Sequence, residues 1–492
     1  MKSKNIFKFF VVGLAIFTMS ACSKYIELNP ISSYNSGSFY KTEADFGLAV
    51  NGIYSQLRSM TNVTLPANLE ERSDNLAKDP TDSYDESLVG KFVENASTGS
   101  VASIWSGYYN LITRCNSVLG TIDAGTFTTE ANRAYYKGEA QFIRGYAYFQ
   151  LGWIYGGVPL LDHVMTSEAI KAVKRSTQDE TFAFAAKDLI AASSNLPVAW
   201  AGTNIGKATK YAAEGILARM YMFQKKFSDA KPLLLDIINS GKYTMAATYA
   251  NCFLDTYDNS PEHVFQIQFT SGGLGQGNSF VMSCVPELIR SALFPIGGQS
   301  TAYLVSYDLY NSYESGDLRR DFTIMKGWTN AGGVTDTYSL YYIKFAHGTM
   351  PSDKSDYAVN GPILRYTDVK LMYAEVLNEE GYNASGEAFN IINAVRARAG
   401  ITPLTATTVP TQQAFRDALL KERRVEFACE MLRWFDLVRT GKALTTIQTF
   451  LALKENGSGT YKMDAYRILF PIPQVELNVN TNTAVLWQNP GY

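Results

Sequence analysis

Apolar residues recur at helical spacing along most of the chain from Thr42 to about Ile238. In one such stretch, residues 135–155, the large apolar side chains fall three or four positions apart and share one helical face. They are Phe142, Tyr146, Phe149, Trp153 and Ile154. Gly156 and Gly157 follow, with Pro159 beyond, and glycine then proline is a physical stop signal for a helix. The pattern predicts a helix that ends at Tyr155.

Several helical stretches echo a helix-turn-helix repeat of about 34 residues, the tetratricopeptide unit. Small residues stand where two helices would approach closely, and tyrosine or leucine stands where a gap must be filled. The matching patterns are Tyr148-x2-Leu151-Gly152-x2-Tyr155, Ala218-x2-Tyr221 and Ala230-x3-Leu234. Further pairs are predicted over residues 209–239, 368–398 and 412–441, with turns near Lys225-Lys226 and Gly381 in the first two. The predicted fold is mostly α, with about four tetratricopeptide-like pairs that are not contiguous.

Residues 261–362 interrupt the helical pattern. Residues 264–269 alternate as a strand, and clusters of Gly, Asn and Thr then separate short aromatic runs such as 338–345. We therefore expect a loop-rich insertion with a few short strands, and loops on a rigid scaffold often carry binding residues. The expected organisation is a signal segment at 1–21, helical regions at 22–260 and 363–492, and the insertion at 261–362 as the candidate ligand face.

The N-terminal segment is typical of an export signal. Basic residues precede a mainly apolar run, and Met19-Ser20-Ala21-Cys22 resembles the lipobox at which a lipoprotein is cleaved and lipidated. Lipidation of Cys22 would tether the chain to a membrane without spanning it. A plain signal peptide and a single transmembrane anchor are the alternatives, although the apolar run is shorter than about 18 uncharged residues.

Charge and cysteine spacing exclude several classes of protein. The formal net charge is −2 without a basic stripe, which argues against a nucleic-acid partner. The cysteines after Cys22 are scattered, and the three histidines are isolated, so we expect no metal site and no cofactor. These cysteines, expected as buried thiols or one adventitious pair, are Cys115, Cys252, Cys284 and Cys429.

Three patterns partly match known binding or catalytic motifs, but each lacks a feature that the motif requires. The stretch 272–279 is one residue from a phosphate-binding loop, but Asn278 occupies the position of the essential lysine. Acidic residues cluster at 79–86, yet this stretch has no EF-hand glycine, so we expect a solvated loop. A glycosidase needs two carboxylates in one cleft, and no local signature singles out a pair.

Residues 421–439 are dense in charge but amphipathic. As one continuous helix, the stretch would place Phe427 and Trp434 on one face and would let Glu430, Arg433 and Asp436 pair at i, i+3 spacing. A catalytic Arg/Glu site is conceivable here, but a structural helix flanked by ion pairs is the favoured interpretation.

Several motifs together resemble the SusD/RagB family of outer-membrane glycan-binding lipoproteins, and their order and spacing cover essentially the whole mature chain. The resembling stretches are Arg144–Leu160, Asp368–Asn378, Glu422–Arg439, Pro471–Gln474 and Gln488–Tyr492, with Trp105-x3-Tyr109-x2-Ile112-x3-Asn116 and Asp317-Leu318-Arg319. The resemblance implies a tetratricopeptide-like fold, a glycan ligand, a location on the outer membrane facing the cell exterior, and a SusC-like TonB-dependent barrel as partner.

Sugars offer apolar C–H faces to aromatic rings and hydroxyls to amides and carboxylates. The aromatic content is 13%, and residues of these types lie in loop-like stretches of the chain. On that basis the candidate glycan-binding residues are Asp74, Asn75, Tyr84, Phe92, Tyr303 and Trp328. Trp105, Trp153 and Trp434 lie in helical patterns and are expected in the core. The expected function is non-enzymatic glycan capture for a transporter, and the alternatives are a lipid-anchored glycan hydrolase and a lid or scaffold for other cargo such as peptides.

Overall fold

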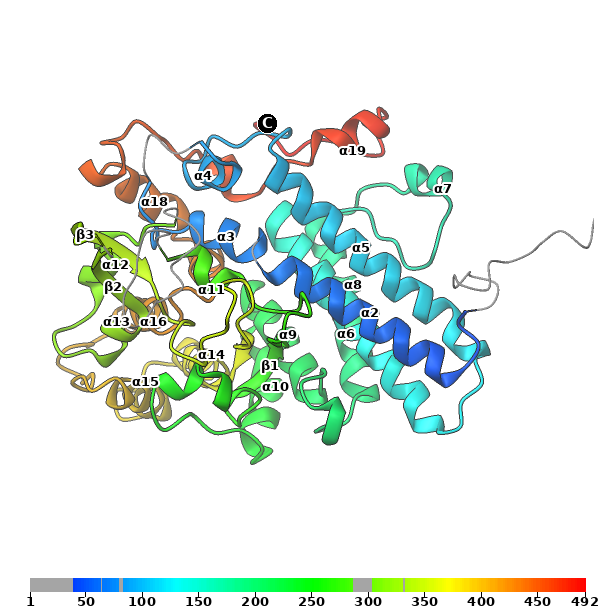
Figure 1. Cartoon of the computed structure of the whole chain (residues 1–492), viewed down its shortest axis with the longest axis horizontal. Coiled ribbons are helices and arrows are strands. Elements are labelled where there is room, and N and C mark those ends of the chain that lie inside the picture. Colours follow the sequence, from blue (N-terminus) through cyan, green and yellow to red (C-terminus); the bar gives the residue numbers. More distant parts are fainter. Residues whose placement is uncertain (1–38, 63, 79–82, 286–302, 331) are drawn as a thin grey trace, which may run out of the picture.

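Helices make up most of the computed structural model, which describes residues 39–62, 64–78, 83–285, 303–330 and 332–492 (Figure 1). The longer helices are α2 (Glu43–Asn62), α5 (Gly99–Thr121), α6 (Glu130–Tyr155), α8 (Gln178–Asn195), α9 (Lys210–Phe223), α10 (Phe227–Asn239), α14 (Tyr366–Glu380), α15 (Glu387–Arg398) and α16 (Gln412–Glu426). The shorter ones are α3 (Thr64–Glu71), α4 (Asp85–Gly90), α7 (Ser167–Ala172), α11 (Phe280–Ser283), α12 (Tyr307–Ser312), α13 (Leu318–Thr323), α17 (Leu432–Arg439), α18 (Ala443–Leu451) and α19 (Gln474–Val479). Two short antiparallel sheets pair β1 (His263–Ile267) with β4 (Gly361–Arg365) and β2 (Ile324–Thr329) with β3 (Thr335–Tyr342).

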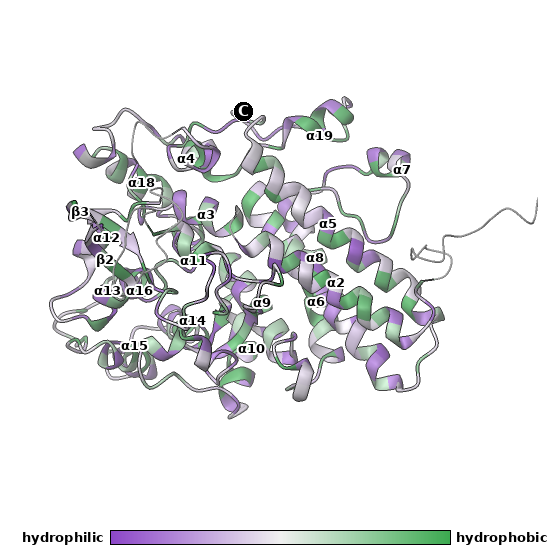
Figure 2. Cartoon of the chain, in the orientation of Figure 1, coloured by the Kyte–Doolittle hydropathy of each residue, from purple (hydrophilic) through white to green (hydrophobic). Residues whose placement is uncertain are grey.

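Four helical pairs form the body, as the sequence pattern predicts: α6 with α8, α9 with α10, α14 with α15, and α16 with α17. The pairs also contact one another, because α9 packs against α8 and α10 packs against α14. Helices α2, α5 and α6 lie together in one half of the molecule, and α12, α13, β2 and β3 lie at the opposite end (Figure 1). Hydrophobic and hydrophilic residues alternate along α2 and α5 (Figure 2), as expected of helices with one buried face.

Helix α6 ends at Tyr155, where the sequence predicts its end. Gly156 has a positive φ of 82°, which favours glycine, and its N–H donates to the carbonyl of Gly152. Gly157 is required for a different reason, because a Cβ there would lie 1.8 Å from the backbone oxygen of Ser176. The glycine pair therefore ends α6 and lets the chain return closely against the segment that precedes α8.

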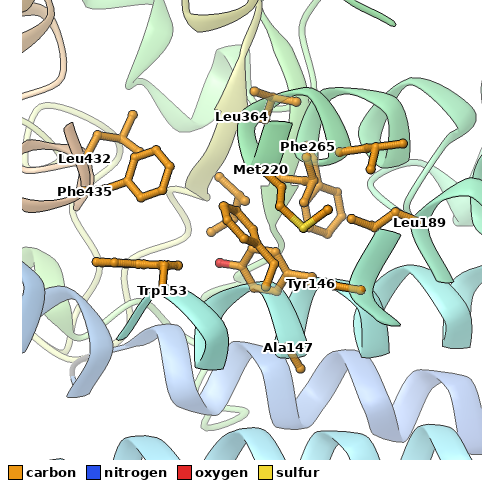
Figure 3. Close-up of a cluster of buried hydrophobic side chains, with 14 of the residues drawn as sticks. Tyr146, Ala147, Trp153, Leu189, Met220, Phe265, Leu364, Leu432 and Phe435 are labelled. Atoms are coloured by element: carbon orange, nitrogen blue, oxygen red, sulfur yellow. The ribbon is translucent and has the colours of Figure 1, made fainter. Parts of the chain in front are cut away.

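The main hydrophobic core lies where the helical pairs meet the β1–β4 sheet. Tyr146 of α6 lies close to Met220 of α9 and Phe265 of β1, and Leu364 of β4 lies nearby (Figure 3). Phe142 and Phe265 meet edge to face with ring centroids 4.9 Å apart. The three tryptophans expected in the core, Trp105, Trp153 and Trp434, are 2–3% exposed, which confirms that expectation.

A second, smaller hydrophobic cluster lies under the insertion, which has the predicted loops and short strands. Its members come from α11, the β2–β3 hairpin and the loops around them, with Val425 of α16 and Ala428 just beyond that helix. The four cysteines after Cys22 are buried and free, as expected of thiols that act as small hydrophobic side chains. The glycine-rich stretch 272–279 binds a carboxylate of the chain itself, because the N–H groups of Gly272 and Gly273 donate to Asp356.

The prediction of one continuous helix over 421–439 is wrong. Helix α16 ends at Glu426, α17 begins at Leu432, and Cys429 and Met431 between them have left-handed backbones with φ of 66° and 62°. In the described structure, Glu430, Arg433 and Asp436 therefore pair with other residues and not with one another as expected.

Two charged residues of this stretch, Glu430 and Arg433, pair with distant elements, whereas Asp436 pairs within the stretch. Glu430 binds Arg365 and Lys344, Arg433 binds Asp74, and Asp436 binds Arg423 and Arg439. The break between α16 and α17 turns Glu430 toward β4 and the β3 segment, which a straight helix cannot do.

Glu426 is the centre of a buried ionic network. Its carboxylate lies 2.6 Å from Arg398, 2.9 Å from Arg365 and 3.1 Å from Arg319, and its exposed fraction is 0%. Burial alone would raise the pKa of Glu426, but these arginines hold it well below the usual range. Because Arg365 also binds Glu262 and Glu430, the network joins the two hydrophobic clusters.

We predict that Arg365→Met lowers the free energy of unfolding by about 3–5 kcal/mol, because it removes the buried arginine that Glu262, Glu426 and Glu430 share. Arg114 is exposed and in no ion pair of the described residues, so Arg114→Met is a matched control with an expected effect within about 0.5 kcal/mol. Urea unfolding of the two variants measures the difference. Equal stability of the two variants would contradict the role given to Arg365.

Candidate functional site

Segment 303–306, just before α12, is held between two other parts of the chain. Leu76 and Val305 form an antiparallel bridge, and the N–H of Val305 donates to the carbonyl of Leu340 in β3 at 2.8 Å. Ser306 donates its N–H to the carbonyl of Asn75 at 2.8 Å. These bonds place Tyr303 and the start of α12 beside the β2–β3 hairpin.

Tyrosines of α12 and β3 form an aromatic surface at this end of the molecule. Tyr307 and Tyr310 meet edge to face with ring centroids 6.5 Å apart, and the Nζ of Lys326 lies 5.7 Å from each ring. The hydroxyl of Tyr307 donates to the carbonyl of Tyr338 at 2.5 Å, and Tyr338 itself is 76% exposed. With Trp328, which is half-buried on β2, we call these four rings the aromatic face.

A bulge in the β2–β3 hairpin sets the direction of the aromatic face. The register shifts between Lys326 and Trp328, and Gly327 between them has φ of 71°. A Cβ at Gly327 would lie 2.5 Å from the backbone oxygen of Asp336, so the close strand approach requires glycine. The bulge therefore interrupts the regular alternation of side chains between Lys326 and Trp328.

Tyr84 and Tyr303, two of the predicted candidates, are brought together. Their ring centroids lie 5.8 Å apart at 77°, and both side chains are half-buried. The hydroxyl of Tyr84 donates to Glu71 at 3.0 Å, and Tyr303 has a left-handed backbone with φ of 61°. Burial raises the pKa of Tyr303, so its phenol stays neutral and keeps both donor and acceptor capacity. Tyr303, Tyr307, Tyr310 and Trp328 all pack against the second hydrophobic cluster.

Asp74 and Asn75 lie beneath this surface and are engaged by arginines. Arg433 donates to both oxygens of Asp74 at 2.7 Å, and Arg424 donates to the side-chain oxygen of Asn75 at 3.0 Å. Burial would raise the pKa of Asp74, but Arg424 and Arg433 hold it below its usual range. With exposed fractions of 2% and 0%, these two side chains support the surface from below and do not face a ligand.

Phe92 belongs to the main hydrophobic core. It is 1% exposed, and its ring packs between Arg72, at 4.8 Å, and Trp434, at 5.8 Å. Among the six predicted candidates, Tyr84, Tyr303 and Trp328 are thus partly accessible, and the other three are buried in the described structure.

Four residues of this surface are not among the candidates predicted from the sequence: Tyr307, Tyr310, Lys326 and Tyr338. The i, i+3 spacing of Tyr307 and Tyr310 was a usable signal, because it places both rings on one face of a short helix. Tyr338 can be assigned to this surface only when the register of the hairpin is known, and the sequence does not give that register.

Some predicted features lie outside the described residues. Cys22 and the signal segment are among them, as are Asp79 and Asp82 of the acidic cluster. Within the described residues, no group of three or more His, Cys, Asp and Glu side chains is arranged to hold a metal ion. No described helix is both long and apolar enough to span a bilayer.

Sequence comparison assigns the family. The model of the SusD family matches residues 328–492, and a second model, described as "Starch-binding associating with outer membrane", matches residues 24–222. A SusD-like protein of Formosa agariphila is 25% identical over 98% of this chain and 97% of its own length. The chain belongs to the SusD/RagB family.

Solved structures share the fold. A surface glycan-binding protein A from Bacteroides fluxus superposes with a TM-score of 0.79 at 25% identity and covers 92% of this chain and 100% of its own. The corresponding protein from Bacteroides thetaiotaomicron, solved in complex with laminarihexaose, gives a TM-score of 0.76 at 22% identity over 91% of this chain and 100% of its own. The mostly helical, tetratricopeptide-like fold is therefore confirmed.

Glu70 is buried beneath the surface, and its protonation makes the stability of the fold depend on pH. It accepts hydrogen bonds from the N–H of Met431 at 2.9 Å and from Asn75 at 3.4 Å, and burial raises its pKa from 4.5 to about 7. Between these two values the folded state binds a proton that the unfolded state does not, so the unfolding free energy falls as pH rises. Glu70→Gln removes this loss, and the variant should gain up to about 3 kcal/mol relative to wild type between about pH 4 and pH 8.

Urea unfolding of both proteins at the two pH values measures this gain. Glu168→Gln is the matched control, because Glu168 is exposed on α7. A stability difference between Glu70→Gln and wild type that is the same at both pH values would contradict the prediction.

Proposed function

We propose that this protein is a lipoprotein of the outer membrane, exposed at the cell surface, that binds oligosaccharide or polysaccharide and delivers it to a SusC-like TonB-dependent transporter. The ligand site is the aromatic face with the neighbouring Tyr84–Tyr303 pair. The observation that carries the proposal is the grouping of partly exposed rings, with hydroxyls and one lysine among them, on a rigidly packed end of a SusD-family fold.

The chemistry of the aromatic face suits a sugar. A pyranose ring presents an apolar C–H face that stacks on an aromatic side chain, and its hydroxyls need donors and acceptors at the ring edge. Tyr338 offers an exposed ring, and Trp328 and Tyr310 offer further apolar area. Lys326 and the hydroxyl of Tyr303 supply polar groups. Asp74 and Asn75 serve as buried support beneath the segment that carries Tyr303.

The relatives support a carbohydrate ligand and an outer-membrane location. The Bacteroides fluxus protein is described as a surface glycan-binding protein, and the family description that matches residues 24–222 names both starch binding and the outer membrane. Membership of this family also supports a non-enzymatic role and a barrel partner. In this proposal Cys22 carries the lipid that anchors the protein in the membrane of the transporter.

We predict that isothermal titration calorimetry against a glycan panel detects binding, and that Trp328→Ala and Tyr338→Ala each weaken it about tenfold or more, since each removes a stacking surface worth about 1–2 kcal/mol. Tyr257→Ala is the matched control, because Tyr257 is also exposed but belongs to a 3-10 turn (Asp255–Tyr257) outside the aromatic face. Unchanged glycan affinity in Trp328→Ala and Tyr338→Ala would contradict the assignment of the ligand site to the aromatic face. Shortened products after incubation of the pure protein with the bound glycan would instead establish a hydrolase.

We predict that Cys22→Ser releases the protein from the membrane fraction, because the lipid can no longer be attached. Protease added to intact cells should degrade the wild-type protein, because it is exposed at the cell surface. The barrel transporter should co-purify with the wild-type protein in detergent. Fractionation and immunoblotting measure both. A wild-type chain that survives protease on intact cells would contradict the surface location.

A further inference from the structure

Two hollows flank the short turn that joins α9 to α10. The first has a volume of about 910 Å³ and lies between α8 and the end of α9, and the second has a volume of about 330 Å³ and lies among α14, α16 and the end of α17. The turn itself, residues 221–227, contributes to both. The two hollows therefore lie on either side of this turn, and we call them together the lysine trough.

The first hollow has an apolar floor. Phe182, Ala186 and Ile190 stand one helical turn apart along α8, and Tyr221 and Phe223 face them from the end of α9. Ile190 is 50% exposed, although a large aliphatic side chain on a helix normally faces a core. The small side chain of Ala186 between the two larger ones leaves a groove into which another helix can pack.

The second hollow has apolar walls and arginines that are already neutralised. Met222, Phe227 and Leu419 line it. Arg416 donates to both oxygens of Glu379 at 2.6 and 2.7 Å, Arg439 does the same with Glu375, and Arg423 binds Asp368 and Asp436. These arginines therefore shape the hollow and leave little charge for a ligand.

The uncompensated charge of the trough comes from lysines. Lys187, Lys225 and Lys226 line it, and among the described residues none of the three lies within ion-pair distance of a carboxylate. Lys225, which has a φ of 58°, lines the second hollow, and Lys187 and Lys226 line the first. The carboxylate of Asp179 is the opposing charge at the rim of the first hollow. The trough is thus apolar at its floor and positive at its edges.

We propose that the lysine trough binds an acidic amphipathic helix of a partner protein. The apolar face of such a helix would cover Ile190, Tyr221 and Phe223, and its acidic side chains would reach Lys187, Lys225 and Lys226. Charge complementarity selects this partner over a basic one, because three unpaired lysines at the rim repel a cationic helix.

This inference is independent of the glycan proposal. The trough is built from the helical pairs α8–α10, α14, α16 and α17, and the aromatic face is built from α12 and the β2–β3 hairpin. A ligand at one surface therefore uses none of the residues of the other, and either site can fail without the other.

A synthetic helical peptide with leucines on one face and glutamates on the other is the probe for this site. Fluorescence anisotropy of the labelled peptide should show saturable binding to the full-length protein, and hydrogen exchange should slow in α8 and in residues 221–227. The double variant Lys225→Glu/Lys226→Glu and the variant Ile190→Asp should each weaken binding at least about tenfold. Both sites are exposed, so circular dichroism should show an unchanged fold.

Lys242→Glu is the matched control, because Lys242 is exposed but lies outside the trough. Its affinity for the peptide should stay within about twofold of wild type. Equal or tighter binding of a peptide with lysines in place of the glutamates overturns the proposal, as does an unchanged affinity in the trough variants. Concentration-dependent self-association that Ile190→Asp abolishes also overturns it, since the trough would then be an interface between two copies of this chain.

Discussion

The buried ionic network around Glu426 is the constraint on which the rest of the structure depends. Glu426 has no exposed surface and is held by Arg319, Arg365 and Arg398, which come from α13, β4 and α15. Charges removed from water are tolerated only when each has its partners in place. The arrangement of the insertion relative to the helical pairs is therefore fixed by these contacts, in addition to the two hydrophobic clusters on either side.

A fixed insertion makes a preformed ligand surface possible. The same break between α16 and α17 that directs Glu430 to Arg365 also directs Arg433 to Asp74, under the segment that carries Tyr303. Rings held this way lose little conformational freedom when a ligand stacks on them. The arrangement requires charged groups to be buried, which is unfavourable. Glu70 shows this effect, because burial raises its pKa to about 7.

Local signals in the sequence predict the helical pairs but not the contacts between distant segments. The end of α6 at Tyr155 and the turn after Phe223 follow from glycines, small residues and spacing within a few positions. The left-handed residues Cys429 and Met431 carry no such signal, because neither is a glycine. Their conformation is imposed by ion pairs with residues far along the chain.

The candidate site shows the same division. Tyr84, Tyr303 and Trp328 could be chosen from residue type and loop context, whereas Asp74 lies buried because Arg433, 359 positions away, covers it. The most direct measurement of the central claim is a crystal structure of the protein with an oligosaccharide that it binds in solution. We expect the sugar to lie on the aromatic face, with a pyranose ring against Tyr338 or Trp328. A sugar bound elsewhere, with the aromatic face empty, would contradict the account.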